Sequence, residues 1–65
     1  MNEEALYAEM RRRFEGNLKQ RLGQDWEDVF HEIFAYCLNK IRTGHARDAE
    51  SYTVAALIRG PAFLV

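Results

Sequence analysis

The chain has 65 residues, a length that supports one hydrophobic core and one domain but leaves that core only marginally stable. Hydrophobic residues make up 48% and charged residues 29%, which is ordinary for a globular chain and too apolar for a disordered one. The formal net charge of -1 gives no overall positive field, so any contact with nucleic acid needs a local patch. We therefore expect a folded domain, and we expect self-association or docking to add to its stability.

Cellular location follows from what the sequence does not contain. No apolar run is long enough to span a bilayer, and Met1-Asn2-Glu3-Glu4 is acidic where a secretory signal is basic. These features predict a cytoplasmic protein with no membrane partner. The lone Cys37 excludes an intramolecular disulfide, and its apolar surroundings predict a buried, reduced thiol.

The first predicted element is a helix over residues 3–22, with acidic residues early, where they meet the positive end of the helix dipole. Gly16-Asn17 places two weak helix formers in its middle, where we expect the helix to soften or bend. Arg11-Arg12-Arg13 does not form one basic surface, because consecutive helical residues point about 100° apart. A stripe that recurs every four residues predicts the core face: Leu6, Met10, Phe14 and Leu18, with Tyr7 beside them.

The second predicted helix covers residues 25–42. Gly23 suits a left-handed helix end, Asp25 suits the N-cap of the next helix, and so short a turn predicts antiparallel neighbours. Asp28, Glu32 and Asn39 fall on one side, and Thr43-Gly44 closes the helix. The opposite side is an apolar stripe: Trp26, Val29, Phe30, Ile33, Phe34, Cys37, Leu38 and Ile41.

The third predicted helix covers residues 48–59, capped by Asp48 and ended by Gly60-Pro61. Residues 52–58 are apolar nearly all round and taken alone also fit a buried strand, but the chain offers no second strand to pair with. The tail, residues 61–65, ends in three large apolar residues, so it either folds back or lies in an interface. The predicted fold class is all-α: one domain, residues 1–65, built as a small three-helix bundle.

No set of residues in the sequence predicts catalysis, so we expect a protein that is not an enzyme and uses no cofactor. His31-Glu32 starts a zinc-protease motif, but the position one turn after His31 holds Ala35 instead of a second histidine. His45 has no carboxylate or cysteine at metal spacing, which indicates a solvated loop histidine. We expect no metal site.

Three acidic residues lie in the first half of the second helix, and the helix dipole accounts for only two of them. Glu27 and Asp28 fall in the first turn, where the helix dipole favours negative charge. Glu32 lies one turn after Asp28, where two like charges cost roughly 0.2–0.5 kcal/mol. Such a penalty is common on surfaces, so a purely structural interpretation and a binding role have about equal weight. A partner that supplies arginine or lysine would turn the penalty into a gain.

The string Trp26-Glu27-Asp28-Val29-Phe30-His31-Glu32-Ile33-Phe34 resembles the Ala-Glu-Asp-Leu-Val-Gln-Glu-Val-Phe signature of region 2 in bacterial sigma factors, especially the extracytoplasmic-function type. Residues 51–60 are similar to the helix that ends in Ile-Ala-Arg-Asn in that family. The resemblance covers about residues 5–60. It implies a helical bundle whose second helix docks on the clamp-helix coiled coil of RNA polymerase, while a later helix and loop grip the promoter -10 element.

By this resemblance the chain is a transcription module, and two sets of residues receive roles. Asp28, His31 and Glu32 would contact the polymerase core, and Arg59, Tyr52 and Arg47 would face promoter DNA. An anti-sigma-like protein is a further implied partner.

The chain also departs from the family. The promoter-melting aromatic is represented by Tyr52 alone, basic residues are sparse over 53–58, and Gly60 replaces the final asparagine, which argues against promoter melting. The helix-turn-helix domain that reads the -35 element is missing, so we expect a fragment or a truncated relative. The alternative function is a helical interaction or dimerisation module that uses its third helix and tail to form a homo-oligomer or to bind another protein. Autonomous binding to duplex DNA is the least favoured possibility.

Overall fold

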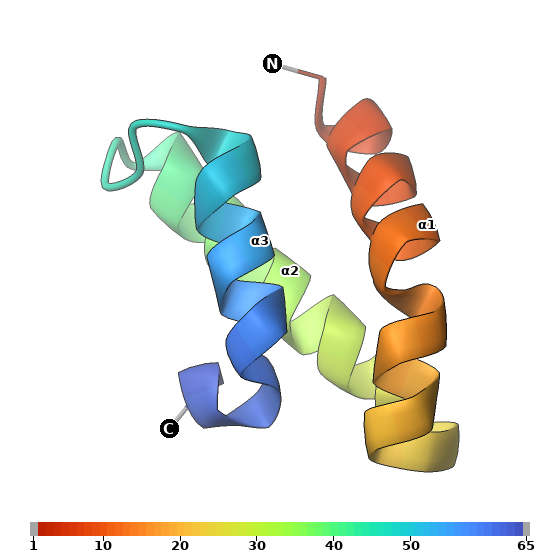
Figure 1. The fold of residues 1–65 in the computed structure, drawn as a ribbon. Coiled ribbons are helices and arrows are strands. Elements are labelled where there is room, and N and C mark those ends of the chain that lie inside the picture. The colour runs from red at the N-terminus through yellow and green to blue at the C-terminus, as the bar shows by residue number, and fades with distance from the viewer. Residues whose placement is uncertain (1, 65) are drawn as a thin grey trace.

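The computed structural model describes residues 2–64 (Figure 1), and these residues are helical apart from Asn2 and the 43–48 loop. The α-helices are α1 (Glu3–Leu22), α2 (Trp26–Arg42) and α3 (Ala49–Arg59), joined by the 3-10 segment η1 (Gly23–Asp25) and followed by η2 (Gly60–Leu64). No strand occurs within residues 2–64, so the all-α prediction is confirmed. The predicted starts of the second and third helices are each one residue earlier than the observed ones.

Helix α1 is capped at both ends by the residues that its sequence offers. The Asn2 side chain accepts a hydrogen bond from the Ala5 backbone N–H at 3.2 Å, which satisfies one of the free amides of the first turn. At the other end Gly23 has φ +68°, and its N–H donates to the Lys19 carbonyl. The helix is continuous through Gly16, so the two weak helix formers do not interrupt it.

The corner between α1 and α2 differs from the prediction, because Asp25 does not cap α2 with its side chain. A capping side chain needs an extended backbone, whereas Asp25 has φ -85° and ψ 4° and belongs to η1. The Trp26 N–H instead bonds to the Gly23 carbonyl, so the chain passes from η1 directly into α2. As predicted, α1 and α2 run in opposite directions, but their axes are inclined (Figure 1).

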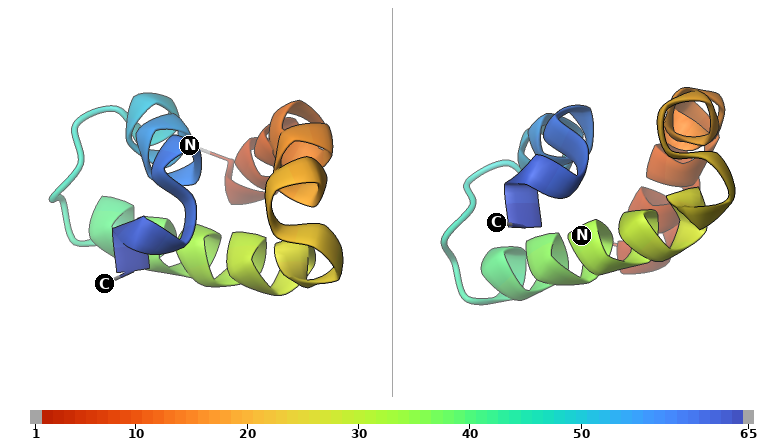
Figure 2. Two further views of the ribbon diagram at one scale, coloured as in Figure 1. Left: turned by 60° about the horizontal axis from the view of Figure 1, so that its bottom comes forward. Right: turned by 90° about the horizontal axis from the view of Figure 1, so that it is seen from below.

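The core lies where the three helices meet. Figure 2 shows α2 along one side, with α1 and α3 both lying across it. The apolar side of α2 therefore contacts both of the other helices, and this sets the rotation of α2 about its axis. The buried core side chains are Leu6, Met10, Leu18, Trp26, Phe30, Ile33, Phe34, Cys37, Ala56 and Leu57.

Helix α3 buries only one of its sides. Its N-cap is Asp48, as predicted, whose side chain accepts from the Ser51 N–H at 3.1 Å. Thr53, Ala56 and Leu57 are buried, whereas Ile58 is 59% exposed. The apolar residues of α3 are therefore only partly covered by the other described helices.

The chain after α3 turns back at Gly60, which has φ +66°, and continues as η2. Phe63 in η2 is half-buried, and its ring meets Tyr36 at 5.1 Å and Tyr52 at 6.0 Å, both edge to face. Of the two alternatives for the tail, Phe63 thus follows the one in which the tail folds back. The side chain of Leu64 and all of Val65 lie outside the described residues.

Candidate functional site

The three residues expected to contact the polymerase are Asp28, His31 and Glu32, which we call the acidic face of α2. All three are exposed. Their position follows from the packing of α2, because the aromatic and aliphatic residues of the same helix face inward and turn this side toward solvent. The structure therefore places the three side chains together on one accessible surface.

The carboxylates of the acidic face differ from most others in the protein in having no cation beside them. Neither Asp28 nor Glu32 has an ion pair within residues 2–64, whereas Glu27 Oε2 lies 3.1 Å from Arg11 Nη2. The remaining ion pairs join Arg11 and Lys19 to Glu15, Arg12 to Glu9, Arg13 to Glu50, and Arg42 to Glu3. The unpaired carboxylates of α2 are thus available to a cation from outside the chain.

His31 is tied to α1 by a contact that sequence reasoning missed. Its Nε2 lies 2.8 Å from the Tyr7 hydroxyl, which also accepts a hydrogen bond from Arg11 Nη1 at 3.3 Å. Arg11 in turn donates to Glu27, and this bond, followed by the one to Tyr7, raises the pKa of Arg11. Arg11 therefore links α1 to α2 through its contact with Glu27.

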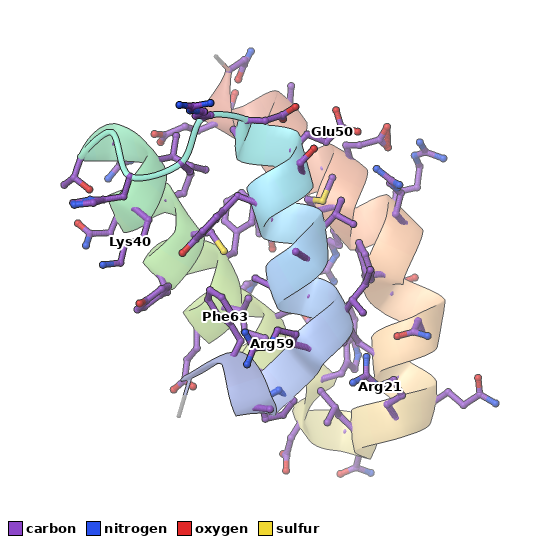
Figure 3. All side chains as sticks on the ribbon, turned by 60° about the vertical axis from the view of Figure 1, so that its left-hand side comes forward. Arg21, Lys40, Glu50, Arg59 and Phe63 are labelled. Atoms are coloured by element: carbon purple, nitrogen blue, oxygen red, sulfur yellow. The ribbon has the colours of Figure 1, made fainter. Side chains whose placement is uncertain are left out.

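Two of the three residues expected to face DNA come together, and one does not. Tyr52 and Arg59 both meet Phe63: the Tyr52 ring lies at 6.0 Å, and the Arg59 guanidinium lies 6.0 Å from the ring centre. Figure 3 shows Arg59 and Phe63 next to each other, with Lys40 on α2 beyond them. Arg47 is in the loop before α3, so the length of that helix, about 16 Å, separates it from Arg59.

Aromatic side chains gather around Phe63 and Arg59. Tyr36 is 42% exposed, lies against Phe63, and has Lys40 Nζ 5.4 Å from its ring centre. Tyr52 is half-buried, and desolvation, with smaller effects from Cys37 and Tyr36, raises the pKa of its phenol. We call Tyr36, Tyr52, Arg59 and Phe63, together with Lys40, the aromatic cluster. Phe63 was expected only as part of the apolar tail, either folded back or in an interface, and its place beside Tyr52 and Arg59 was not predicted.

Arg42 pairs with Glu3 and does not join the aromatic cluster. Its Nε donates to Glu3 Oε2 at 2.8 Å, which joins the start of α1 to the end of α2. The hydrogen bond from Arg42, together with its charge, holds the pKa of Glu3 below the ordinary value. Arg42 therefore belongs to the packing of α1 on α2.

The structure also locates the residues considered for metal or thiol chemistry. Within residues 2–64 no group of three or more histidine, cysteine, aspartate or glutamate side chains is placed to hold a metal ion. Cys37 is buried, and desolvation raises the pKa of its thiol to about 11, which keeps it protonated and unreactive. In the same part of the chain, no helix is both long and apolar enough to cross a membrane.

Comparisons of the chain with models of protein families, with curated proteins and with solved structures found no match. The resemblance to sigma region 2 therefore stays a prediction.

Proposed function

We propose that the chain is a sigma-region-2-like transcription module, with the corresponding helical bundle, that binds the RNA polymerase core through the acidic face of α2. One observation supports it above the others: Asp28 and Glu32 lie exposed, one turn apart, and neither forms an ion pair with a residue of the described chain. Two like charges at this spacing cost roughly 0.2–0.5 kcal/mol in the free protein. A partner helix that presents arginine or lysine removes that cost and gains charge-assisted hydrogen bonds.

The packing of α2 supports the same proposal. The signature residues that resemble the family divide into a buried set and an exposed set, because Phe30, Ile33 and Phe34 are buried while Asp28 and Glu32 are exposed. A helix held this way from inside presents its outer side as a rigid surface, so a partner pays little to order it.

Binding of the purified chain to the clamp-helix coiled coil of RNA polymerase tests the proposal. The double variant Asp28→Lys/Glu32→Lys reverses both charges, and we expect it to lose binding while its helical content, measured by circular dichroism, is unchanged. Binding of this variant as tight as that of the wild type would refute the proposal.

A matched control separates the acidic face from net charge. Glu4→Lys/Glu9→Lys changes the formal charge by the same amount on α1, where Glu4 has no ion pair within the described residues and Glu9 has only an exposed pair with Arg12. Exposed pairs contribute little, so this variant should fold and bind the coiled coil nearly as well as the wild type. Equal losses in both double variants would indicate a general charge effect.

Contact with promoter -10 DNA is a finer part of the proposal, and the aromatic cluster supports it. Arg59 and Lys40 supply positive charge beside aromatic rings, a combination that suits unpaired bases and their phosphates. Arg59→Ala should weaken binding of the chain, in complex with the polymerase, to -10 single strands, and Arg47→Ala should do so less.

The alternative is an interaction or dimerisation module, and the exposure of Ile58 favours it. Phe63 is half-buried against Tyr36 and Tyr52, and among the described residues of α3 and the tail Ile58 is the large apolar side chain that is exposed to a second copy. Sedimentation equilibrium of the wild type and of Ile58→Glu tests this alternative. It requires self-association that the substitution abolishes, and a wild type that is monomeric at all concentrations counts against it.

A further inference from the structure

A chain of hydrogen bonds crosses from α1 to the edge of the acidic face at His31. Arg11 Nη2 donates to Glu27 Oε2 at 3.1 Å, Arg11 Nη1 donates to the Tyr7 hydroxyl at 3.3 Å, and that hydroxyl lies 2.8 Å from His31 Nε2. His31 lies between Asp28 and Glu32 in the sequence of α2. At about 100° per residue His31 lies beside the pair of Asp28 and Glu32, on the flank nearer Tyr7, so the ring nitrogen that carries the hydrogen decides which hydrogen-bonding group this edge of the acidic face shows.

The direction of each bond follows from the chemistry of Arg11. A guanidinium has donors and no acceptor, so the Tyr7 oxygen must be the acceptor of that contact. The positive charge beside the phenol makes its O–H a stronger donor and its oxygen a poorer acceptor for a second N–H group. Tyr7 therefore donates its proton to His31 Nε2, which must carry a lone pair. In a neutral imidazole the hydrogen is then on Nδ1.

The core holds the phenol in this position. The Tyr7 ring meets Phe30 at 5.4 Å and Phe34 at 5.3 Å, both edge to face, and stacks on the His31 ring at 5.8 Å. Phe30 and Phe34 are buried, so the hydroxyl is aimed at His31 by packed aromatic rings and by Arg11 together. No hydrogen bond within residues 2–64 involves His31 Nδ1, which leaves that nitrogen for a group outside the chain.

We propose that Tyr7 is a positioning residue that fixes His31 in the Nδ1–H tautomer, so that the acidic face offers one N–H donor beside its two carboxylates. The partner surface that fits has cations opposite Asp28 and Glu32 and an oxygen acceptor, a carbonyl or a carboxylate, opposite His31. The statement about the partner rests on the proposed function, whereas the statement about the tautomer does not.

Long-range proton–nitrogen NMR spectra of the histidine rings, recorded at a pH where they are neutral, test the tautomer directly. We expect Nδ1–H at His31 in the wild type, and in Tyr7→Phe a shift toward Nε2–H, the form that free neutral histidine prefers. This substitution keeps the ring that packs on Phe30 and removes only the hydroxyl. His45, which contacts Thr43 instead, should not change. An Nε2–H tautomer in the wild type, or one unaltered by Tyr7→Phe, would overturn the proposal.

Binding to the polymerase clamp-helix coiled coil tests the donor. Tyr7→Phe should weaken binding to this coiled coil about fivefold, as expected for one weakened hydrogen bond. In a His31→Gln background the side-chain amide supplies a donor without help from Tyr7, so the same substitution should have no effect there. Equal losses in both backgrounds, or no loss in either, would overturn the role of the donor. If the wild type does not bind this coiled coil, the proposed function fails, and the tautomer is still decided by the spectra.

Discussion

Glu27 and Asp28 are consecutive residues, but only the first has a cation beside it within the described residues. Glu27 Oε2 accepts a hydrogen bond from Arg11 Nη2 at 3.1 Å, whereas Asp28 has no ion pair within residues 2–64. The helical rotation of about 100° between them turns Glu27 toward α1 and Asp28 away from it. The first carboxylate thus helps to hold the two helices together, and the second, like Glu32, has no ion pair within the described residues.

Replacing Glu32 by glutamine should stabilise the free protein. The substitution removes the repulsion from Asp28 and breaks no ion pair, and glutamine forms helices about as well as glutamate. The expected gain is about 0.2–0.5 kcal/mol, or roughly 1–4 °C in the thermal midpoint for a domain of this size. Thermal unfolding followed by circular dichroism measures it. A fall in the midpoint would show that Glu32 has a stabilising contact, and the case for a binding role would weaken.

Gly16→Ala should stabilise the chain by about 0.5–1 kcal/mol, because glycine inside a helix costs conformational entropy. The added Cβ would have no heavy atom within 4 Å outside the local helix backbone. Urea unfolding measures the change.

Gly60→Ala is the matched control for this substitution. Gly60 has φ +66°, and a Cβ there would lie 3.0 Å from Arg21 Nη2, so we expect a loss of about 1–3 kcal/mol. A gain in stability from both substitutions would contradict the positive φ of Gly60, and a loss from both would contradict the position of Gly16 inside a helix.

The thiol of Cys37 should resist alkylation while the protein is folded. Its pKa is about 11, whereas a thiol in an unfolded chain titrates near roughly 8.5. In the unfolded chain the thiol loses its proton at a lower pH than in the folded protein. The contribution of Cys37 to the free energy of unfolding should therefore be complete at low pH and be lost as pH rises from about 8.5 toward 11. Iodoacetamide labelling at pH 8, with and without urea, measures the protection. Rapid labelling of the folded protein would contradict the burial of this residue.

The pair between Glu3 and Arg42 should make stability sensitive to acid. The pKa of Glu3 is lowered in the folded state, so its contribution is complete above the pKa of the unfolded carboxyl and is lost as pH falls through the folded one. Glu3→Gln should therefore lower stability near neutral pH and have less effect in acid, with Glu4→Gln as an unpaired control. Urea unfolding at several pH values measures this. A difference between wild type and Glu3→Gln that does not depend on pH would contradict the prediction.

Much of the helical framework could be predicted from the sequence because the determinants are local. Asp48 caps α3 through its own neighbours, Gly23 and Gly60 adopt the positive φ angles that glycine permits, and the stripe of α2 is a matter of spacing. The exposure of Asp28 and Glu32 follows from the same spacing.

The remaining features depend on contacts between residues far apart in the chain. Tyr7 reaches His31, Arg42 reaches Glu3, and Phe63 meets Tyr36, and no local pattern specifies these pairs. Which apolar residues of α3 stay exposed also depends on such contacts, because the other helices cover Ala56 and Leu57 and leave Ile58 exposed.

The most direct measurement of the central claim is an NMR titration of the isotopically labelled chain with the clamp-helix coiled coil of RNA polymerase. If the acidic face is the binding surface, the largest changes in amide chemical shift will be at Asp28, His31 and Glu32, with little change at Arg47 and Ile58. Changes centred on α3 with an unaffected acidic face, or no changes at all, would contradict the account.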